Sequence, residues 1–488
     1  MNKVIKITAI LLISKILLAQ NLTEDFLVNS SENNTQGLGR TSIAAHSDGT
    51  FAIGWQDYNE YNSPIAEIPR IAVQMFSSTG NRIGQTNLFQ GENRSLSIWL
   101  SDYLDVNSDL AFLPDKTLLV AVEHEGRLSI GNDDVSSSEV GIGAVNSSGE
   151  LIDISNEEGI IEWYISTETK WLEHPRISVG KNGNFILTAD GATYSTNNRG
   201  VIAQVFDSNG NLSGGMFTPH FNDLGPQVNH RDPDVATNGE ISMIVWQDGS
   251  NGSDWDISAQ FFNSSGFLGN NMPVHSNDPA GTVNVLPSVD MNANGESVIV
   301  WLDTRDNPNG EVFAQLYNSN GQKVGDNIKV SNNSVNILDR PEVAILNNGS
   351  FMVVWSDNIT NSSDISGYRA LGRQYDLNGN PITDILVIPN DDVASGFINI
   401  ASDGFDYYCS WLDNRMNTPY LNVYAKKILS LSTDIKNKEN DIPNEYLLMQ
   451  NYPNPFNPST IIQYTIPMLS NDSVSEQQVI LRIYDILG

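Results

Sequence analysis

Residues 340–390 decide the fold, and they read RPEVAILNNGSFMVVWSDNITNSSDISGYRALGRQYDLNGNPITDILVIPN. The run FMVVWSD at 351–357 is apolar on both alternating faces, which indicates a strand that is covered on both sides. Short turns of the Asn-Gly kind separate apolar runs on either side of it. Its Trp-x-Asp mark recurs about every 55 residues, at Trp55-Asp57, Trp246-Asp248, Trp301-Asp303, Trp355-Asp357 and Trp411-Asp413. A repeat of this length, made of short strands and Gly turns, is typical of a β-propeller blade.

The same unit can be laid along most of the chain. Two copies are eroded, because Val122-Glu123-His124 and Ala189-Asp190-Gly191 stand where Trp-x-Asp is expected. The last copy lacks a fourth strand, which segment 24–33 (EDFLVNSSEN) can supply because it resembles DNIKVSNNSVN of an earlier copy. The predicted units are residues 37–93, 94–159, 160–227, 228–284, 285–337, 338–393 and 394–430. We therefore predict an all-β, seven-bladed β-propeller with four-stranded blades, closed by its two ends and with the repeated Trp residues in the core between blades.

The start of the chain and its composition limit the possible partners. Residues 1–19 combine a charged start, an apolar core and the small residue Ala19, which is typical of a secretory signal peptide. No later apolar run is long enough to span a membrane, so we expect no transmembrane segment in the mature chain. The formal net charge is −32, which argues against a nucleic-acid partner because such a surface repels phosphate backbones. Cys409 is the single cysteine, so the chain cannot form an internal disulfide.

The tail carries the motif NYPNPFNPST at 451–460 and, further on, the strand pattern VILRIYDILG at 479–488. These residues resemble the C-terminal sorting domain of cargo proteins of the type IX secretion system of the Bacteroidota. The matching positions include Asn451, Pro453, Asn454, Pro455, Phe456, Asn457, Pro458, Tyr484, Asp485 and Gly488. The resemblance implies an Ig-like β-sandwich, here partial because the family's domain continues past this turn, and a role in export by that machinery to the medium or the outer-membrane surface. The earlier repeats also resemble bacterial secreted β-propeller repeats of the form VVWxD…AQ(F/Y)DxxG.

The predicted domains are thus a signal peptide (1–19), a propeller (20–430), a linker (431–445) and a truncated sorting domain (446–488). Within the propeller, the longer connections follow the second and fourth strands and emerge on one face, where binding residues tend to gather. The candidate ligand-binding residues are Arg40, Tyr58, Tyr61, Arg176, Tyr194, Arg231, Trp255 and Arg340. His174 and His230 stand with these arginines where first strands begin, and the set could bind an anionic group at the channel mouth. The alternative is salt bridges between blades, because Glu173, Asp232, Asp234 and Asp339 are close in sequence.

Acidic loop residues suggest calcium as the one candidate cofactor. The metal candidates are Asp254, Asp256, Asp303 and Asp306, although no loop has the regular spacing of a dedicated calcium site. The sequence contains no Gly-x-Ser-x-Gly, no His-Glu-x-x-His and no phosphate loop, so no catalytic residue is assigned. We therefore expect a surface protein that binds a glycan or a protein, for example in adhesion, rather than an enzyme. The alternative is a carbohydrate-active enzyme, a glycoside hydrolase or lyase, that uses acidic residues at the channel mouth.

Overall fold

The computed structural model describes the chain in segments that are mostly its strands and short turns. The described residues are 23–29, 40–57, 70–89, 107–130, 133–152, 160–163, 169–193, 199–220, 229–249, 255–276, 279–332, 336–337, 339–358, 367–391, 393–416, 421–431, 447–448 and 464–465. The chain divides into two units, Met1–Leu431 and Ser432–Gly488. None of the described segments contains a helix with the length and apolar character that a membrane crossing requires.

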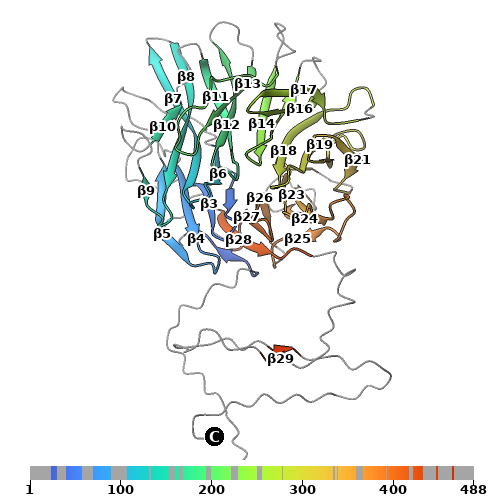
Figure 1. Cartoon of the computed structure of the whole chain (residues 1–488). Coiled ribbons are helices and arrows are strands. Elements are labelled where there is room, and N and C mark those ends of the chain that lie inside the picture. Colours follow the sequence, from blue (N-terminus) through green and yellow to red (C-terminus); the bar gives the residue numbers. More distant parts are fainter. Residues whose placement is uncertain are drawn as a thin grey trace, which may run out of the picture. The chain divides into compact units, whose positions relative to one another are not determined.

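Seven antiparallel sheets follow one another along the described part of the first unit (Figure 1). The first three contain β2 (Ser42–Ala45), β3 (Phe51–Asp57), β4 (Arg70–Phe76) and β5 (Arg82–Phe89); β6 (Ser108–Phe112), β7 (Leu118–Ile130), β8 (Asp133–Val145), β9 (Leu151–Ile152) and β10 (Ile160–Trp163); and β11 (Thr169–Val179), β12 (Phe185–Thr193) and β13 (Arg199–Phe206). The next three contain β14 (His230–Thr237), β15 (Ser242–Asp248), β16 (Asp256–Asn263) and β17 (Gly266–Pro273); β18 (Asn284–Met291), β19 (Ser297–Asp303), β20 (Glu311–Tyr317) and β21 (Lys323–Lys329); and β22 (Glu342–Ile345), β23 (Phe351–Asn358), β24 (Tyr368–Tyr375) and β25 (Leu386–Val387). The seventh joins β26 (Ser395–Ser402), β27 (Tyr407–Asp413) and β28 (Asn422–Ile428) to β1 (Phe26–Leu27).

These sheets are the blades of a propeller, and most have four strands, as the repeat predicts. Two blades vary on this plan. In the second, both β10 and the short β9 pair with β8. In the third, isolated bridges from Phe217 to Ala203 and from Leu212 to Phe206 take the place of a regular fourth strand. The seven-bladed, all-β fold is therefore confirmed.

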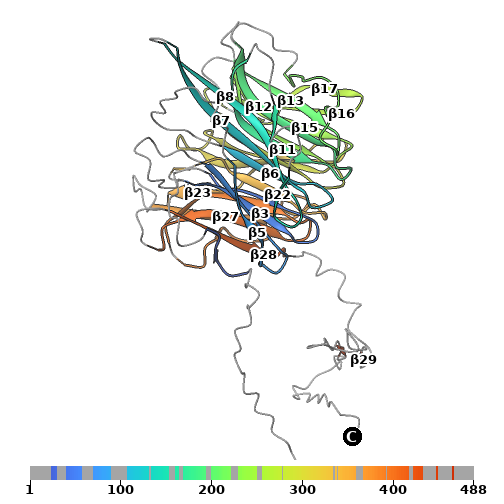
Figure 2. The ribbon, with the colours of Figure 1, turned by 90° about the vertical axis from the view of Figure 1, so that its left-hand side faces the viewer.

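The predicted closure of the ring is confirmed within residues 23–29. Strand β1 pairs antiparallel with β28, with Phe26 opposite Ala425. The backbone amide of Val28 then donates to the Val423 carbonyl oxygen at 2.8 Å. Figure 1 and Figure 2 both show the last blade, in orange, beside the blue strands of the first. The N-terminal segment thus completes the seventh blade and removes the exposed edge that β28 would otherwise have.

The core lies between blades, and the repeated Trp residues occupy it as predicted. Trp301 is fully buried against Met243 and Val245 of the preceding blade. Trp355 packs in the same way against Val298 and Val300 of the fifth blade. These strands are buried along both faces, which explains why they are apolar throughout rather than alternating.

Inter-blade hydrogen bonds join the innermost strands around the channel. The carboxylate of Asp109 accepts the backbone N–H of Ile177 in the next blade at 2.8 Å. Asp290 accepts the N–H of Ile345 at 2.9 Å in the same way. Burial raises the pKa of Asp109 to about 6 and that of Asp290 to about 7, and the nearby charge of Asp234 adds to both shifts. These carboxyl groups therefore hold neighbouring blades together in an environment that favours their neutral form.

In the second unit the structure describes two short strands, β29 (Leu447–Leu448) and β30 (Tyr464–Thr465), which pair antiparallel. The sorting-motif positions from Asn451 to Gly488 named above lie outside the described residues, and so does the signal peptide at 1–19. The β-sandwich and its role in sorting therefore stay predictions.

Candidate functional site at the mouth of the central channel

The first strand of each blade is the innermost and lines a central cavity of about 370 Å³. On β11 the lining runs from Arg176 to Val179, at the end that turns into β12. His174 lies two residues before Arg176, toward the end where the strand begins. We call this end the loop-side mouth. Arg40, His174, Asp232 and Arg340 lie there, just before the cavity-lining residues of their blades. Glu123 contacts His174 at the same end, and Arg176 is the lining residue of β11 nearest to it. It belongs to the face on which the connections after the second and fourth strands emerge.

A β-bulge interrupts four of the innermost strands near the mouth. His174, Asp232, Leu286 and Phe397 have φ values between 48° and 56°, in the left-handed region. The strand register shifts beside each of them, for example between Glu173 and Arg176. A bulge re-aims the side chain that it carries, and it costs local strain in a residue other than Gly. As a result the Nε2 of His174 lies 3.7 Å from the Oδ1 of Asp232 in the next blade.

The middle residue of the Trp-x-Asp mark, or of its eroded form, supports two of these bulges from the preceding blade. In the fourth blade Gln247 Oε1 accepts the backbone N–H of Leu286 at 3.3 Å. In the second blade the equivalent residue is Glu123, and its Oε2 accepts the N–H of His174 at 3.2 Å. Asn107 donates to the same oxygen at 2.8 Å. Glu123 therefore makes a structural contact that glutamine makes elsewhere, but with a group that can carry a proton.

His174 is held in place by a buried carboxylate of its own blade. Asp190 is fully buried, and its Oδ1 lies 2.7 Å from the His174 Nδ1. Arg199 forms short contacts with both Asp190 and Glu173. Because a carboxylate accepts hydrogen bonds, Nδ1 carries a proton toward Asp190, while Nε2 faces Asp232.

The environment shifts the pKa values of the acidic groups in opposite directions. Burial raises the pKa of Glu123 to about 7, although hydrogen bonds from Asn107 and His174 oppose the shift. Burial acts in the same sense on Asp232, but the charges of His174, Arg340 and Arg40 outweigh it and lower its pKa. Burial alone would lower the pKa of His174, whereas its hydrogen bond to Asp190 and the surrounding carboxylates raise it. The mouth can therefore keep a neutral carboxyl and an ionised one on either side of a cationic imidazole.

Glu173, His174 and Asp190 bring one ligand atom each within 4.8 Å of one another, a spacing that could hold a metal ion. Arg199, however, already binds Glu173 and Asp190. Its guanidinium occupies the position that a cation would need, so this group is better described as an ion-pair network.

The structure brings three of the predicted ligand-binding residues together. Arg40 pairs with Asp339, which is next to Arg340 in the chain, and Arg176 lies 3.9 Å from Glu342 of the same blade. Arg231 and Trp255 instead contact each other, with the guanidinium 5.3 Å from the ring centroid. Tyr58, Tyr61 and Tyr194 lie outside the described residues.

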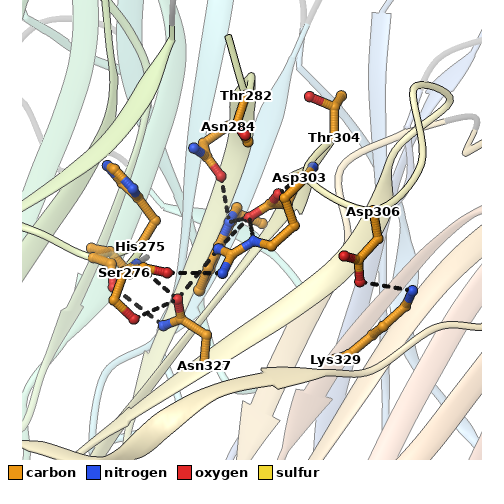
Figure 3. Close-up of polar contacts among 12 residues, drawn as sticks. His275, Ser276, Thr282, Asn284, Asp303, Thr304, Asp306, Asn327 and Lys329 are labelled. Carbon is orange, nitrogen blue, oxygen red and sulfur yellow. Dashed lines mark hydrogen bonds and ion pairs between the residues drawn. The ribbon is translucent and has the colours of Figure 1, made fainter. Parts of the chain in front are cut away.

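The predicted metal residues do not converge among the described residues. Asp303 is fully buried and accepts hydrogen bonds from the Trp301 indole at 3.1 Å and from the Arg305 guanidinium Nε at 2.8 Å. Asp306 pairs with Lys329 at 3.0 Å, and Figure 3 shows this pair apart from Asp303. Asp256 lies 3.2 Å from the Nε2 of His275, and Asp254 lies outside the described residues. Each described carboxylate thus has a basic partner within the chain.

Sequence reasoning missed Glu123 and Asp190 as candidates for the site. Both occupy the middle position of the two eroded Trp-x-Asp marks, in adjacent blades. The signal was present, because a carboxyl group replaces a neutral residue at that position only where the Trp is also lost. When two neighbouring units lose the repeated residues, the change can indicate a functional site there rather than a simple loss of the repeat.

No known protein family matches this chain, and no curated protein matches it either. Among solved structures, a protein of unknown function from Dyadobacter fermentans is 10% identical, with a TM-score of 0.46 over 84% of this chain and 99% of that one. The polysaccharide lyase Uly1 is 10% identical, with a TM-score of 0.47 over 83% and 94%. The α-L-arabinofuranosidase Arb93A from Fusarium graminearum is 15% identical, with a TM-score of 0.43 over 69% and 94%. At these identities and TM-scores the likeness carries no conclusion about what this chain does.

Proposed function

We propose that the loop-side mouth cleaves a glycosidic bond, with Glu123 as the proton donor and Asp232 as the ionised carboxylate. The observation that supports this proposal is that both carboxyl groups adjoin His174, Glu123 Oε2 at 3.2 Å from its backbone nitrogen and Asp232 Oδ1 at 3.7 Å from its Nε2, while their pKa values shift in opposite directions. Hydrolysis of a glycoside needs such a pair, since one carboxyl must give a proton while the other stays charged. Of the two roles considered from the sequence, this proposal takes the carbohydrate-active enzyme rather than the surface protein that only binds a glycan or a protein.

The chemistry assigns a separate task to each group. Glu123 gives its proton to the glycosidic oxygen as the bond from that oxygen to the anomeric carbon breaks. Asp232 either takes a proton from the water that adds to the anomeric carbon or attacks that carbon itself. His174 is a positioning residue, because its charge keeps Asp232 ionised and Asp190 fixes its ring.

The decisive variant is Glu123→Gln. Glutamine occupies the equivalent position in the first and fourth blades, as Gln56 and Gln247, and Gln247 makes the corresponding contact there. The variant should therefore fold normally but lose the proton. We expect activity to fall by about 100-fold or more, measured as reducing ends released from a panel of plant and algal polysaccharides. Glu240→Gln, at an exposed pair with Lys181, is the matched control.

Two results would contradict this assignment. If Glu123→Gln and the control release reducing ends at the same rate, the proton donor is a different group. If the native protein binds glycans on an array but cleaves none of them, the protein is a binding module, and its role is adhesion or recognition through the same face. The melting temperature of each variant shows whether a loss of activity reflects misfolding.

We also propose that the protein is exported and delivered by type IX secretion. The support is in the sequence, namely the signal-like residues 1–19 and the motif at 451–460. A fluorescent protein fused to residues 446–488 behind a signal peptide tests the sorting role in a host that has this machinery. Retention of the fusion in the periplasm would argue against it.

A further inference from the structure

Three arginines from non-adjacent blades converge at the loop-side mouth. Arg40 belongs to the first blade, Arg176 to the third and Arg340 to the sixth. Arg340 is 2% exposed and reaches the fourth blade, where its Nη2 donates to the Asp232 carbonyl oxygen at 3.2 Å. A weaker contact joins its Nη1 to the Pro233 carbonyl at 3.5 Å. Such convergence is unusual in a chain with 58 acidic and 26 basic residues.

The charge of Arg340 is less well compensated than that of its neighbours. Arg40 binds Asp339, and Arg176 lies 3.9 Å from Glu342. Glu342 and Asp234 offset the charge of Arg340 from a distance, but among the described residues no carboxylate oxygen lies within 4.0 Å of its guanidinium, and its Nε has no hydrogen-bond partner. Burial lowers the pKa of Arg340 to about 10, and the charges of Arg176 and Arg40 contribute to that shift. An anion that directly contacts a buried cation in this situation would add the close partner that the chain itself does not provide.

We infer that the mouth binds the carboxylate of an acidic sugar, with Arg40 as the group that contacts it and Arg340 beneath. This inference rests on the proposed function, whose substrate it narrows to glycans that contain uronic acids. Arg40 is the outermost of the three, with 30% of its side chain exposed. A planar carboxylate matches the fork of guanidinium N–H groups that Asp339 leaves available. His174 Nε2, which is beyond hydrogen-bond distance from Asp232, adds a second cationic donor nearby.

The test compares an acidic with a neutral oligosaccharide of the same length, tetragalacturonate and cellotetraose, by titration calorimetry on the full chain. We expect the acidic ligand to bind roughly tenfold more tightly, and this preference to shrink as salt is added. Arg40→Gln should abolish the preference, whereas Arg40→Lys should keep part of it because it keeps the charge. Lys181→Gln removes a positive charge at an exposed pair with Glu240 and should leave the preference unchanged.

The outcomes separate this inference from the proposed hydrolysis. Equal affinity for the two tetrasaccharides, or an unchanged preference in Arg40→Gln, overturns the inference even if Glu123→Gln has lost activity on neutral glycans. A preference for the acidic ligand without any cleavage supports the carboxylate site and contradicts the hydrolase. The same titration is repeated with a sulfated oligosaccharide of equal length. If it binds more tightly than tetragalacturonate, the inference that the site prefers a carboxylate is overturned.

Discussion

Replacement of Phe26 by alanine tests how much the N-terminal strand contributes to the closed ring. Phe26 is 5% exposed, and strand β1 ties it to β28 of the seventh blade. Its ring meets the rings of Phe51 and Phe76 of the first blade edge-on, with centroids 6.2 Å and 5.7 Å away. One side chain thus joins the two ends of the propeller.

The expected loss follows from this burial. Truncation of a buried Phe to Ala costs about 3–5 kcal/mol, because transfer free energy is lost and a cavity remains. The two edge-on ring contacts place Phe26→Ala toward the upper part of that range. The free energy of unfolding is measured by urea denaturation, followed by tryptophan fluorescence.

Phe405→Ala is the matched control, because it makes the same chemical change at a side chain that is 64% exposed. We expect it to change the free energy of unfolding by about 0.5 kcal/mol or less. A loss of under about 1 kcal/mol in Phe26→Ala would refute the reasoning, since it would mean that the ring does not depend on this closure.

Stability should also depend on pH, because Asp109, Asp290 and Glu123 have folded-state pKa values of about 6, 7 and 7. Folding favours their neutral forms, so this stabilisation is complete below the unfolded pKa values near 4 and is lost as pH rises through about 6 to 7. The melting temperature should therefore fall between about pH 4 and 7 and level off above that, and Asp290→Asn should flatten the fall. If melting is independent of pH across that window, these groups are not buried as described. A chain cut after Leu431 should melt like the full chain, because the unit boundary falls there, and a lower melting temperature would mean that the second unit stabilises the propeller.

The blades were predictable because the signal for them is local. Strands that pair within a blade follow one another along the chain, so alternation, Gly turns and the Trp-x-Asp mark describe each sheet before any long-range contact is known. The closure of the ring could also be predicted from the sequence, because segment 24–33 resembles a fourth strand and the last unit, 394–430, lacks one. Asp303, by contrast, was named as a metal candidate, whereas in the structure it accepts a backbone N–H at the end of its strand.

The site was predictable only in part. Arg40, Arg176 and Arg340 occupy similar positions near the start of first strands, so grouping them at one mouth followed from the repeat. Glu123 and Asp190 were interpreted as signs of erosion, because nothing local shows that a bulge in the next blade lies against them. The repeat pattern predicts the strands within each blade, whereas a side chain such as Glu123 makes its contact with the next blade.

The sequence by itself determined that this chain forms a ring of seven blades, most of them four-stranded, closed by its own N-terminal segment, since the blade pattern repeats about every 55 residues. Only the tertiary structure decided which charged groups meet at the mouth. Glu123 meets His174 across 51 residues of sequence, and Arg340 meets Asp232 across 108. The curvature of the ring brings these residues together in space although they are far apart in the sequence. The shifted pKa values that suggest chemistry there arise from burial, which exists only after the blades have closed around the channel.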